Sequence, residues 1–333
     1  MNAKILVGDV RERLSEIPDK SVQCVVTSPP YWGLRDYGHD DQLGLEATPA
    51  QYVENMVSVF REVGRVLSDD GTLWLNLGDS YASGSKGSGG NGSSGTLRAA
   101  RGVDGSYVGS VAANYFDVRR FDLKAMNVKA KSLLGIPWRV AFALQDDGWY
   151  LRQDIIWAKP NPMPESVKDR CTKSHEYLFL LSKSPKYFFD SAAIAEPSIY
   201  GSIDKRAGSG RLTYDGKRQG EKGTGQEAFV HIEETRNKRD VWTIPAQPFK
   251  GAHFAVMPEA LVTPCVLAGS REGDTVLDPF AGSGTVGVVA LRHQRDFIGI
   301  ELNPEYAEMA QRRIVDDAPM LNVVSSCLSV EAK

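Results

Sequence analysis

Two patterns alternate along most of this chain: short apolar stretches of strand length, and longer stretches with apolar residues at helical spacing. The strand-like stretches are residues 4–7, 22–27, 72–77, 150–158, 177–181, 275–277 and 297–300. Helical spacing recurs in residues 10–17, 52–67, 138–146, 258–268 and 286–292. Because strands and helices alternate, the pattern predicts a large α/β core.

The alternation is interrupted twice by polar segments that contain many glycines. Residues 83–131, predicted to be a mobile loop, hold eight basic against three acidic residues, an excess of +5. Residues 200–226 hold six basic against three acidic residues, an excess of +3. Each segment is either a plain solvated or disordered stretch or a flexible basic element that closes on phosphates. The second interpretation gives as candidate DNA contacts Arg119, Arg120, Lys205, Arg206, Arg211, Lys217 and Arg218.

Composition narrows the class of protein. The chain has 333 residues, more than a usual single domain, which favours one large core with a smaller inserted module. Its formal net charge is −3, so a nucleic-acid partner would need a local basic surface. The apolar runs are too short to span a membrane, and no charged-then-apolar leader precedes Asp9. The four cysteines, widely separated and without zinc-binding spacing, fit a reduced cytoplasm; they are Cys24, Cys171, Cys265 and Cys327.

One apolar run ends abruptly in the sequence Thr27-Ser28-Pro29-Pro30-Tyr31. Neither proline can donate a hydrogen bond to a sheet and each fixes its own φ, so the sequence predicts a stiff loop at the carboxyl end of a strand. Ligands of open α/β sheets bind at that edge. A rigid hydroxyl, exposed carbonyls and an aromatic ring together suit a flat group with an exocyclic amine, such as a nucleobase.

A second ligand-binding pattern lies at residues 275–301. A predicted strand runs into Asp278, a turn through Gly282 and Gly284 opens a helix, and the next strand ends at Glu301. Glycines let a ligand approach the backbone closely, and the start of the helix offers free N–H groups. An acidic residue about twenty residues further on can accept hydrogen bonds from the two hydroxyl groups of a ribose. Together these features indicate an adenosine-containing ligand. Asp9, after another predicted strand, is either a helix cap or a further hydrogen-bond acceptor.

Both motifs in this order resemble those of the S-adenosylmethionine-dependent DNA amino-methyltransferases, which methylate cytosine N4 or adenine N6. The catalytic loop precedes the insert and the insert precedes the cofactor turn, as in the permuted β-class, over roughly residues 4–314. The resemblance implies a doubly wound, mostly parallel, seven-stranded class I methyltransferase (Rossmann-like) sheet, circularly permuted, with an inserted target-recognition module. Residues 1–190 and 246–315 would form the catalytic and cofactor-binding parts of one core, residues 191–245 the insert, and residues 316–333 a peripheral C-terminal tail.

The resemblance also assigns roles. Ser28 Oγ and the Pro29 carbonyl would accept hydrogen bonds from the target amine, and Tyr31, next to Pro30, would stack on a base flipped from the duplex. Around S-adenosyl-L-methionine, Glu301 would bind the ribose and Asp9 the adenine amino group. The remaining cofactor residues would be Asp278, Phe280, Gly282, Gly284, Thr285, His253 and Pro258. No metal ion and no cysteine adduct are needed for an amino target.

Some alternatives stay open at this point. His253 also fits a helix cap or a surface residue, and Glu301 an exposed acid at a strand end. Ser28 and the sequence His253-Phe-Ala-Val-Met-Pro258 resemble the cytosine-N4 subgroup. Adenine N6 is the main alternative target, followed by RNA or protein targets and by an inactive DNA-binding relative. The expected partner is double-stranded DNA, with the protein acting in the cytoplasm as a monomer or homodimer. Whether it belongs to a restriction-modification pair with a cognate restriction endonuclease stays open.

Overall fold

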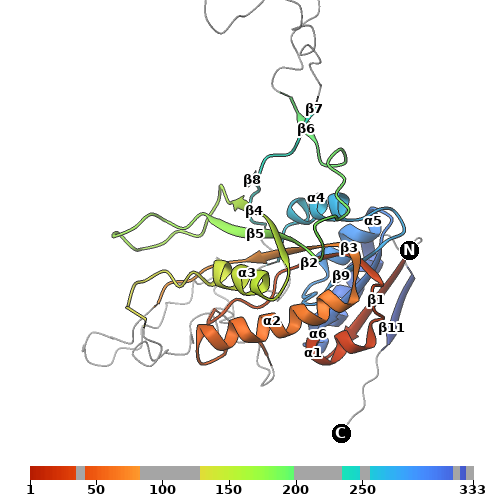
Figure 1. Cartoon of the computed structure of the whole chain (residues 1–333), viewed down its shortest axis with the longest axis horizontal. Coiled ribbons are helices and arrows are strands. Elements are labelled where there is room, and N and C mark those ends of the chain that lie inside the picture. The colour runs from red at the N-terminus through yellow and green to blue at the C-terminus, as the bar shows by residue number, and fades with distance from the viewer. Residues whose placement is uncertain (35–41, 83–127, 199–234, 248–255, 318–322, 328–333) are drawn as a thin grey trace, which may run out of the picture.

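The computed structural model describes residues 1–34, 42–82, 128–198, 235–247, 256–317 and 323–327 (Figure 1). The strands in these ranges are β1 (Asn2–Val7), β2 (Val22–Thr27), β3 (Leu67–Leu77), β4 (Tyr150–Ala158), β5 (His175–Ser182), β6 (Glu196–Pro197), β7 (Thr235–Arg236), β8 (Val241–Thr243), β9 (Thr275–Asp278), β10 (Asp296–Glu301) and β11 (Val323–Cys327). The helices are α1 (Val10–Arg13), the short 3-10 helix η1 (Leu14–Glu16), α2 (Pro49–Val66), α3 (Ile136–Asp146), α4 (Glu259–Gly269), α5 (Thr285–Arg292) and α6 (Pro304–Asp317).

Nine of the described strands form one sheet, in the order β11-β1-β10-β9-β2-β3-β5-β4-β8. Neighbouring strands are parallel except that β5 is antiparallel to both β3 and β4. The mostly parallel α/β sheet is therefore confirmed. The expected number of seven strands was too low, because β8 pairs with β4 and β11 pairs with β1. The three residues of β8 and the half-polar β11 are too short or too polar for an apolar-run pattern to find. Residues 323–327, in the predicted C-terminal tail, thus extend the sheet at its edge.

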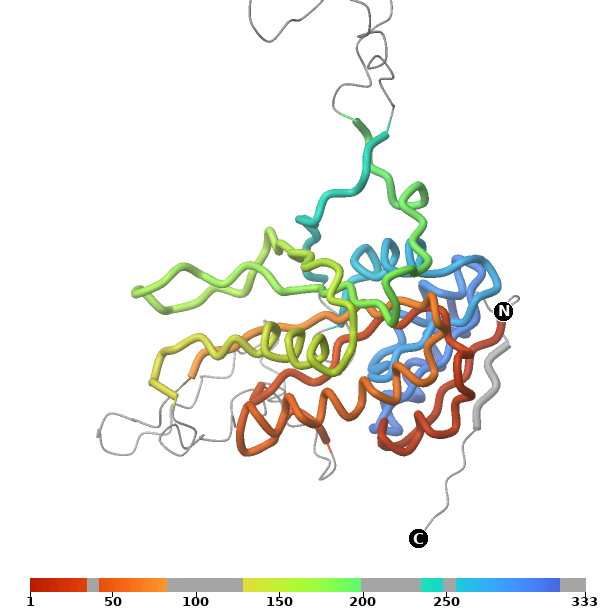
Figure 2. Tube along the Cα trace, in the orientation of Figure 1, coloured from red at the N-terminus to blue at the C-terminus, as the bar shows by residue number. Residues whose placement is uncertain are grey.

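Strands from opposite ends of the chain lie side by side in the middle of the sheet (Figure 2). The C-terminal strands β9 and β10 sit between the N-terminal strands β1 and β2, with Ile5 opposite Gly299 and Val25 opposite Leu277. This arrangement brings the carboxyl ends of four parallel strands to one edge. Asp9, Ser28, Asp278 and Glu301 follow or end those strands, so the fold places all four near one another. Circular permutation itself stays a prediction.

Helices cover both faces of the sheet, as expected for a doubly wound fold. Along β2, Val25 packs in the core beneath α1, α2 and α3, whereas Cys24 and Val26 pack in the core beneath α4, α5 and α6. Figure 1 shows α2 and α4 on opposite sides of the sheet. Because successive side chains of a strand point to opposite faces of the sheet, one set of strands contributes to two separate hydrophobic cores. In the described part of the chain, no helix is long and apolar enough to cross a membrane.

The predicted recognition segments are described only in part. Strands β6 and β7 form a small antiparallel pair outside the main sheet. Of the mobile loop 83–131, only residues 128–131 lie in the described ranges. All seven candidate DNA contacts lie outside those ranges, as does His253.

Candidate active site

A pocket of about 1150 Å³, including its open mouth, lies at the carboxyl edge of β1, β2, β9 and β10. Both predicted motifs contribute to its wall. The predicted site residues that line it are Asp9, Ser28, Pro29, Pro30, Tyr31, Asp278, Phe280, Gly282, Thr285 and Glu301. The predicted catalytic loop and the predicted cofactor turn therefore share one cavity.

Two predicted cofactor residues do not line this pocket. Gly284 precedes α5 with φ +76°, and a Cβ at this position would lie 2.8 Å from Ala310 Cβ on α6. A glycine is needed here because of the backbone conformation and the helix contact, rather than for an approach to a ligand. Pro258 stands immediately before α4, and the neighbouring Val256 and Met257 line the pocket instead.

One hydrogen bond joins the two motifs directly. Thr27 Oγ1 donates to Asp278 Oδ1 at 2.7 Å, and the backbone N–H of Phe280 donates to the same oxygen at 3.0 Å. Desolvation raises the pKa of Asp278 to about 7, although these two hydrogen bonds act in the opposite direction. Thr27 and Asp278 thereby fix the spacing between the end of β2 and the end of β9.

The carboxylate of Glu301 is held by backbone groups of the pocket wall. Glu301 Oε2 accepts from the Gly282 N–H at 2.8 Å, and Oε1 accepts from the Asn303 N–H at 2.9 Å. Asn303 in turn accepts the Glu305 N–H at 2.8 Å at the start of α6. These bonds fix the orientation of the carboxylate toward the glycine turn.

Asp9 already has a cationic partner. Its Oδ1 accepts from the backbone N–H of Arg11 at 2.7 Å and from Arg11 Nε at 2.9 Å, and Asp9 caps α1. Partial burial acts to raise the pKa of Asp9, but the hydrogen bonds and charge of Arg11 outweigh it, so the pKa lies below its usual value. The sequence left two interpretations of Asp9 open, a helix cap and a hydrogen-bond acceptor for a ligand. The structure fits both, because Asp9 caps α1 and also lines the pocket.

The Ser-Pro-Pro-Tyr loop is fixed by side chains from distant segments. Tyr31 Oη donates toward Glu176 Oε2 at 2.8 Å and Asn76 Oδ1 at 3.0 Å, and accepts from Ser28 Oγ at 3.3 Å. The Tyr52 hydroxyl donates to the Pro30 carbonyl at 2.9 Å. Desolvation, followed by the nearby charge of Glu176, raises the pKa of the Tyr31 phenol well above its usual value.

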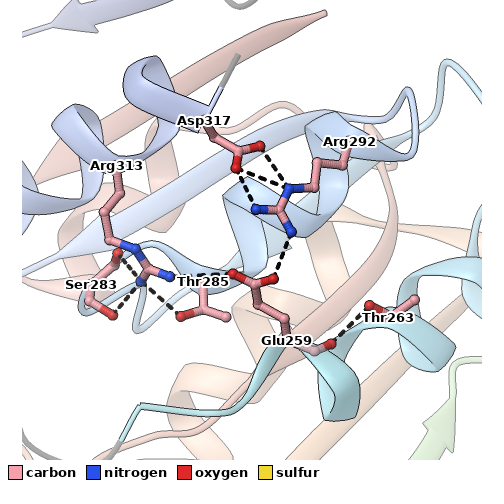
Figure 3. Close-up of polar contacts among 7 residues, drawn as sticks. All are labelled: Glu259, Thr263, Ser283, Thr285, Arg292, Arg313 and Asp317. Atoms are coloured by element: carbon pink, nitrogen blue, oxygen red, sulfur yellow. Dashed lines mark hydrogen bonds and ion pairs between the residues drawn. The ribbon is translucent and has the colours of Figure 1, made fainter. Parts of the chain in front are cut away.

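A polar cluster supports the glycine turn from behind (Figure 3). Arg313 Nη1 on α6 donates to the Ser283 carbonyl at 2.8 Å, to Ser283 Oγ at 2.9 Å and to Thr285 Oγ1 at 3.0 Å. Desolvation lowers the pKa of the Arg313 guanidinium. The Thr285 hydroxyl thus faces Arg313, although the residue also contributes to the pocket wall.

Several residues that build the site were not predicted from sequence. Asn76, Tyr52 and Glu176 are separated in the chain from the groups that they hold, so no local motif marks them. Thr27 begins the predicted loop sequence, but its hydrogen bond to Asp278 was not predicted. A buried asparagine inside the apolar run of β3 was the one available signal, because a buried amide needs hydrogen-bond partners. Other residues that line the pocket and were not predicted from the sequence are Leu34, Gln42, Leu43, Leu302, Asn303 and Tyr306.

Many ligand-binding proteins share a doubly wound sheet with a pocket at its strand ends, and the solved structures that match this one have the methyltransferase fold. A Thermus thermophilus protein assigned as a DNA modification methylase, complexed with S-adenosyl-L-methionine, matches with a TM-score of 0.57, 24% identity and 98% coverage of both chains. The PvuII DNA methyltransferase (cytosine-N4-specific) matches with a TM-score of 0.59, 19% identity and coverage of 95% of this chain and 91% of its own.

Sequence comparisons then give the family. The DNA methylase family matches residues 22–312. The type II methyltransferase M.SmaI of Serratia marcescens is 47% identical over 94% of this chain and 91% of its own length, and M.Cfr9I of Citrobacter freundii is 46% identical over 94% and 87%. The chain belongs to the N6/N4 DNA methylase family.

Proposed function

We propose that this chain is a site-specific DNA methyltransferase that transfers a methyl group from S-adenosyl-L-methionine to the exocyclic N4 of a flipped cytosine in duplex DNA. The observation that carries this proposal is the 2.7 Å hydrogen bond between Thr27 and Asp278. It joins the loop suited to a base and the turn suited to an adenosine cofactor in one pocket. Donor and acceptor of a methyl group must meet in such a shared space.

The residues of the glycine turn fit the cofactor. S-adenosylmethionine, when bound, supplies an electrophilic sulfonium methyl group. The Glu301 carboxylate is fixed by two backbone N–H groups on the pocket wall. A carboxylate oriented in this way can accept hydrogen bonds from the hydroxyl groups of a ribose. Val10, Phe280 and Ile300 supply apolar wall for an adenine ring. Asp9 would bind the adenine amino group with the carboxylate that Arg11 orients.

The residues of the Ser-Pro-Pro-Tyr loop fit an aromatic amine. The lone pair of such an amine is delocalised into its ring, so the enzyme must localise it and align it for attack. Ser28 and Pro29 line the pocket. Ser28 Oγ and the Pro29 carbonyl would accept the two amine hydrogens, stabilising the developing positive charge. The Pro30 carbonyl is already bound by Tyr52, which leaves Pro29 as the acceptor. Tyr31 would offer its ring to the flipped base.

Two observations favour cytosine as the target. Position 28 carries a neutral serine, as in the cytosine-N4 subgroup that the sequence resembles, and the PvuII enzyme of the same fold is cytosine-N4-specific. The similarity to type II methyltransferases supports DNA as the substrate and the cytoplasm as the place of action. It also supports a restriction endonuclease as the partner enzyme. We assign residues 1–190 and 246–315 to the catalytic core and residues 191–245 to target recognition.

The target base is read directly from methylated DNA. The full-length protein is incubated with S-adenosylmethionine and unmethylated genomic DNA, and the DNA is digested to nucleosides for mass spectrometry. We expect N4-methylcytosine. Detection of N6-methyladenine would show that adenine is the target. If the cofactor binds but no methyl group is transferred, the protein is an inactive DNA-binding relative.

DNA binding is proposed to depend on the basic insert. Replacing Lys205, Arg206 and Arg211 by alanine should weaken binding and reduce the slope of log affinity against log salt by about 0.9 for each phosphate that is no longer neutralised. Lys20→Ala is the control, because Lys20 precedes the amino end of β2, away from the pocket edge. An unchanged salt slope in the triple variant would remove these residues from the DNA interface.

A further inference from the structure

The pocket contains a chain of hydroxyl groups that ends in a carboxylate. Ser28 Oγ lies 3.3 Å from Tyr31 Oη, and Tyr31 Oη lies 2.8 Å from Glu176 Oε2. Ser28 and Tyr31 line the pocket, whereas Glu176 lies behind Tyr31 at the start of β5. The three groups come from two segments that are 145 residues apart in the chain.

The direction of these hydrogen bonds follows from their partners. Asn76 Nδ2 donates to the Tyr177 carbonyl at 3.1 Å, which turns Asn76 Oδ1 toward Tyr31 as a second acceptor. The phenol has one hydrogen, and the carboxylate is both closer and charged, so the hydrogen is directed to Glu176. The Tyr31 oxygen is then free to accept the Ser28 hydrogen. Ser28 presents its remaining lone pairs to the pocket.

The carboxylate at the end of this chain has a cationic partner. Glu176 Oε1 forms an ion pair with Lys159, whose side chain is only 18% exposed. Lys173 adds a second positive charge at longer range, and Tyr31 is the titratable group on the other side. A charged pair that is mostly out of water interacts more strongly than one on the surface. Lys159 thus occupies Glu176 Oε1, and Glu176 Oε2 is directed at Tyr31.

We infer that Ser28, Tyr31 and Glu176 form a proton relay that removes the proton released when the target amine is methylated. This inference rests on the proposed methyl transfer to an exocyclic amine, and it applies equally to cytosine and adenine. A neutral serine is too weak a base to keep that proton. The relay supplies the basic group that position 28 lacks.

Atoms and electrons balance in each step of the relay. The nitrogen lone pair forms the bond to the methyl carbon, the carbon–sulfur bond breaks, and sulfur keeps that electron pair. The nitrogen now carries a positive charge and loses one proton to Ser28 Oγ. The Ser28 hydrogen passes to Tyr31 Oη, and the Tyr31 hydrogen passes to Glu176 Oε2. The products are a neutral methylated amine and a neutral Glu176 carboxyl, which then loses its proton to solvent through its 17% exposed side chain.

Glu176→Gln separates proton acceptance from structural support. Glutamine keeps the size of the side chain and can accept the Tyr31 hydrogen bond, but it cannot take the proton. Single-turnover transfer to unmethylated genomic DNA should slow by about 100-fold, with the dissociation constants for S-adenosylmethionine and DNA unchanged. Tyr31→Phe, which keeps the ring, should slow transfer by a similar factor. A wild-type rate in Glu176→Gln would overturn the relay and leave Glu176 as a structural residue.

A matched control and a second measurement complete the test. Glu165 is also a half-buried carboxylate in an ion pair, with Arg170, so Glu165→Gln should transfer methyl groups at the wild-type rate. In protein labelled with [13Cζ]tyrosine, Tyr31→Phe identifies the Tyr31 resonance, which Glu176→Gln should shift and Glu165→Gln should not. This spectrum tests the hydrogen bond without turnover, so an unshifted resonance refutes the relay even if wild-type protein methylates no DNA. Absent wild-type transfer with a shifted resonance would count against the proposed function alone.

Discussion

The two halves of the pocket are held in place by different means. In the glycine turn at residues 278–285, the Asp278 and Glu301 carboxylates bind backbone N–H groups within a few residues of the turn or at the next strand end. Arg313 of α6 is a more distant support of the same turn. The Ser-Pro-Pro-Tyr loop depends on remote side chains, among them Tyr52, Asn76 and Glu176. Most hydrogen bonds that hold the cofactor turn therefore come from residues close to it in the chain, whereas those that hold the base-binding loop come from distant segments that the sheet brings near.

This difference predicts separable failures. Changes around the loop should lower turnover and spare the affinity for S-adenosylmethionine. Changes around the turn should lower that affinity first. The Thr27–Asp278 hydrogen bond is a polar contact that belongs to both halves.

Ser28→Ala should cause the largest loss. It removes the hydroxyl acceptor for the target amine, so turnover should fall by about 100-fold or more, while the dissociation constant for S-adenosylmethionine stays unchanged. Steady-state kinetics and cofactor titration measure the two quantities. Ser21→Ala is the control, because Ser21 precedes the other end of the same strand and its hydroxyl bonds only the Pro18 carbonyl. A wild-type rate in Ser28→Ala would remove this residue from the mechanism.

Glu301→Ala should raise the dissociation constant for S-adenosylmethionine by about 10- to 100-fold, since hydrogen bonds to a charged group contribute roughly 1.5 to 3 kcal/mol. It also leaves the Gly282 N–H without its acceptor. Isothermal titration is the measurement. Glu308→Ala, which removes an exposed carboxylate of α6, is the control and should bind as wild type does. Equal affinities in the two variants would refute the assignment of Glu301 to the ribose.

Gly78→Ala should disturb the loop without touching the turn. A Cβ at residue 78 would lie 2.5 Å from Tyr31 Cε2, so the ring must move. We expect about tenfold lower turnover and a loss of roughly 1 to 3 kcal/mol in unfolding free energy. Gly64→Ala on α2, where the nearest atom would be 3.3 Å away, is the milder control. Reduced cofactor affinity in Gly78→Ala would show that the two halves are not separable.

Asp278→Asn should act mainly on the pH dependence of stability. The pKa of Asp278 is about 7 in the fold against 3.8 for the ordinary group, so the folded protein binds more protons between pH 4 and 7. The contribution of Asp278 to the wild-type unfolding free energy therefore falls as pH rises through this window, by about 1 kcal/mol per pH unit at its steepest. The variant should lack this slope, so its stability relative to wild type should rise from pH 4 to 7 and then level off. Denaturant unfolding at several pH values measures the difference, and parallel curves for the two proteins would contradict it.

The same contrast explains what could be predicted from the sequence. The glycine turn, the acid at the next strand end and the rigid proline loop each leave a local mark, and the alternation of strands and helices gave the sheet that brings them together. Glu176 and Tyr52 carry no such mark, because their roles depend on the neighbours that the sheet order gives them. Strands β8 and β11 were missed for a related reason, since pairing with β4 and β1 rather than an apolar run defines them.

The pairing of β11 with β1 also bears on how the protein behaves when its C-terminus is shortened. β1 lies next to β11, which forms the edge of the sheet, and their register runs from Asn2 opposite Val323 to Leu6 opposite Cys327. A chain cut after Asp317 would leave the outer backbone groups of β1 without partners. An exposed strand of that kind is a template for β-pairing with other molecules. Residues 323–327 therefore occupy the outer pairing groups of β1, so shortening the chain would expose a strand whose carboxyl end leads into Gly8 and Asp9 of the pocket wall.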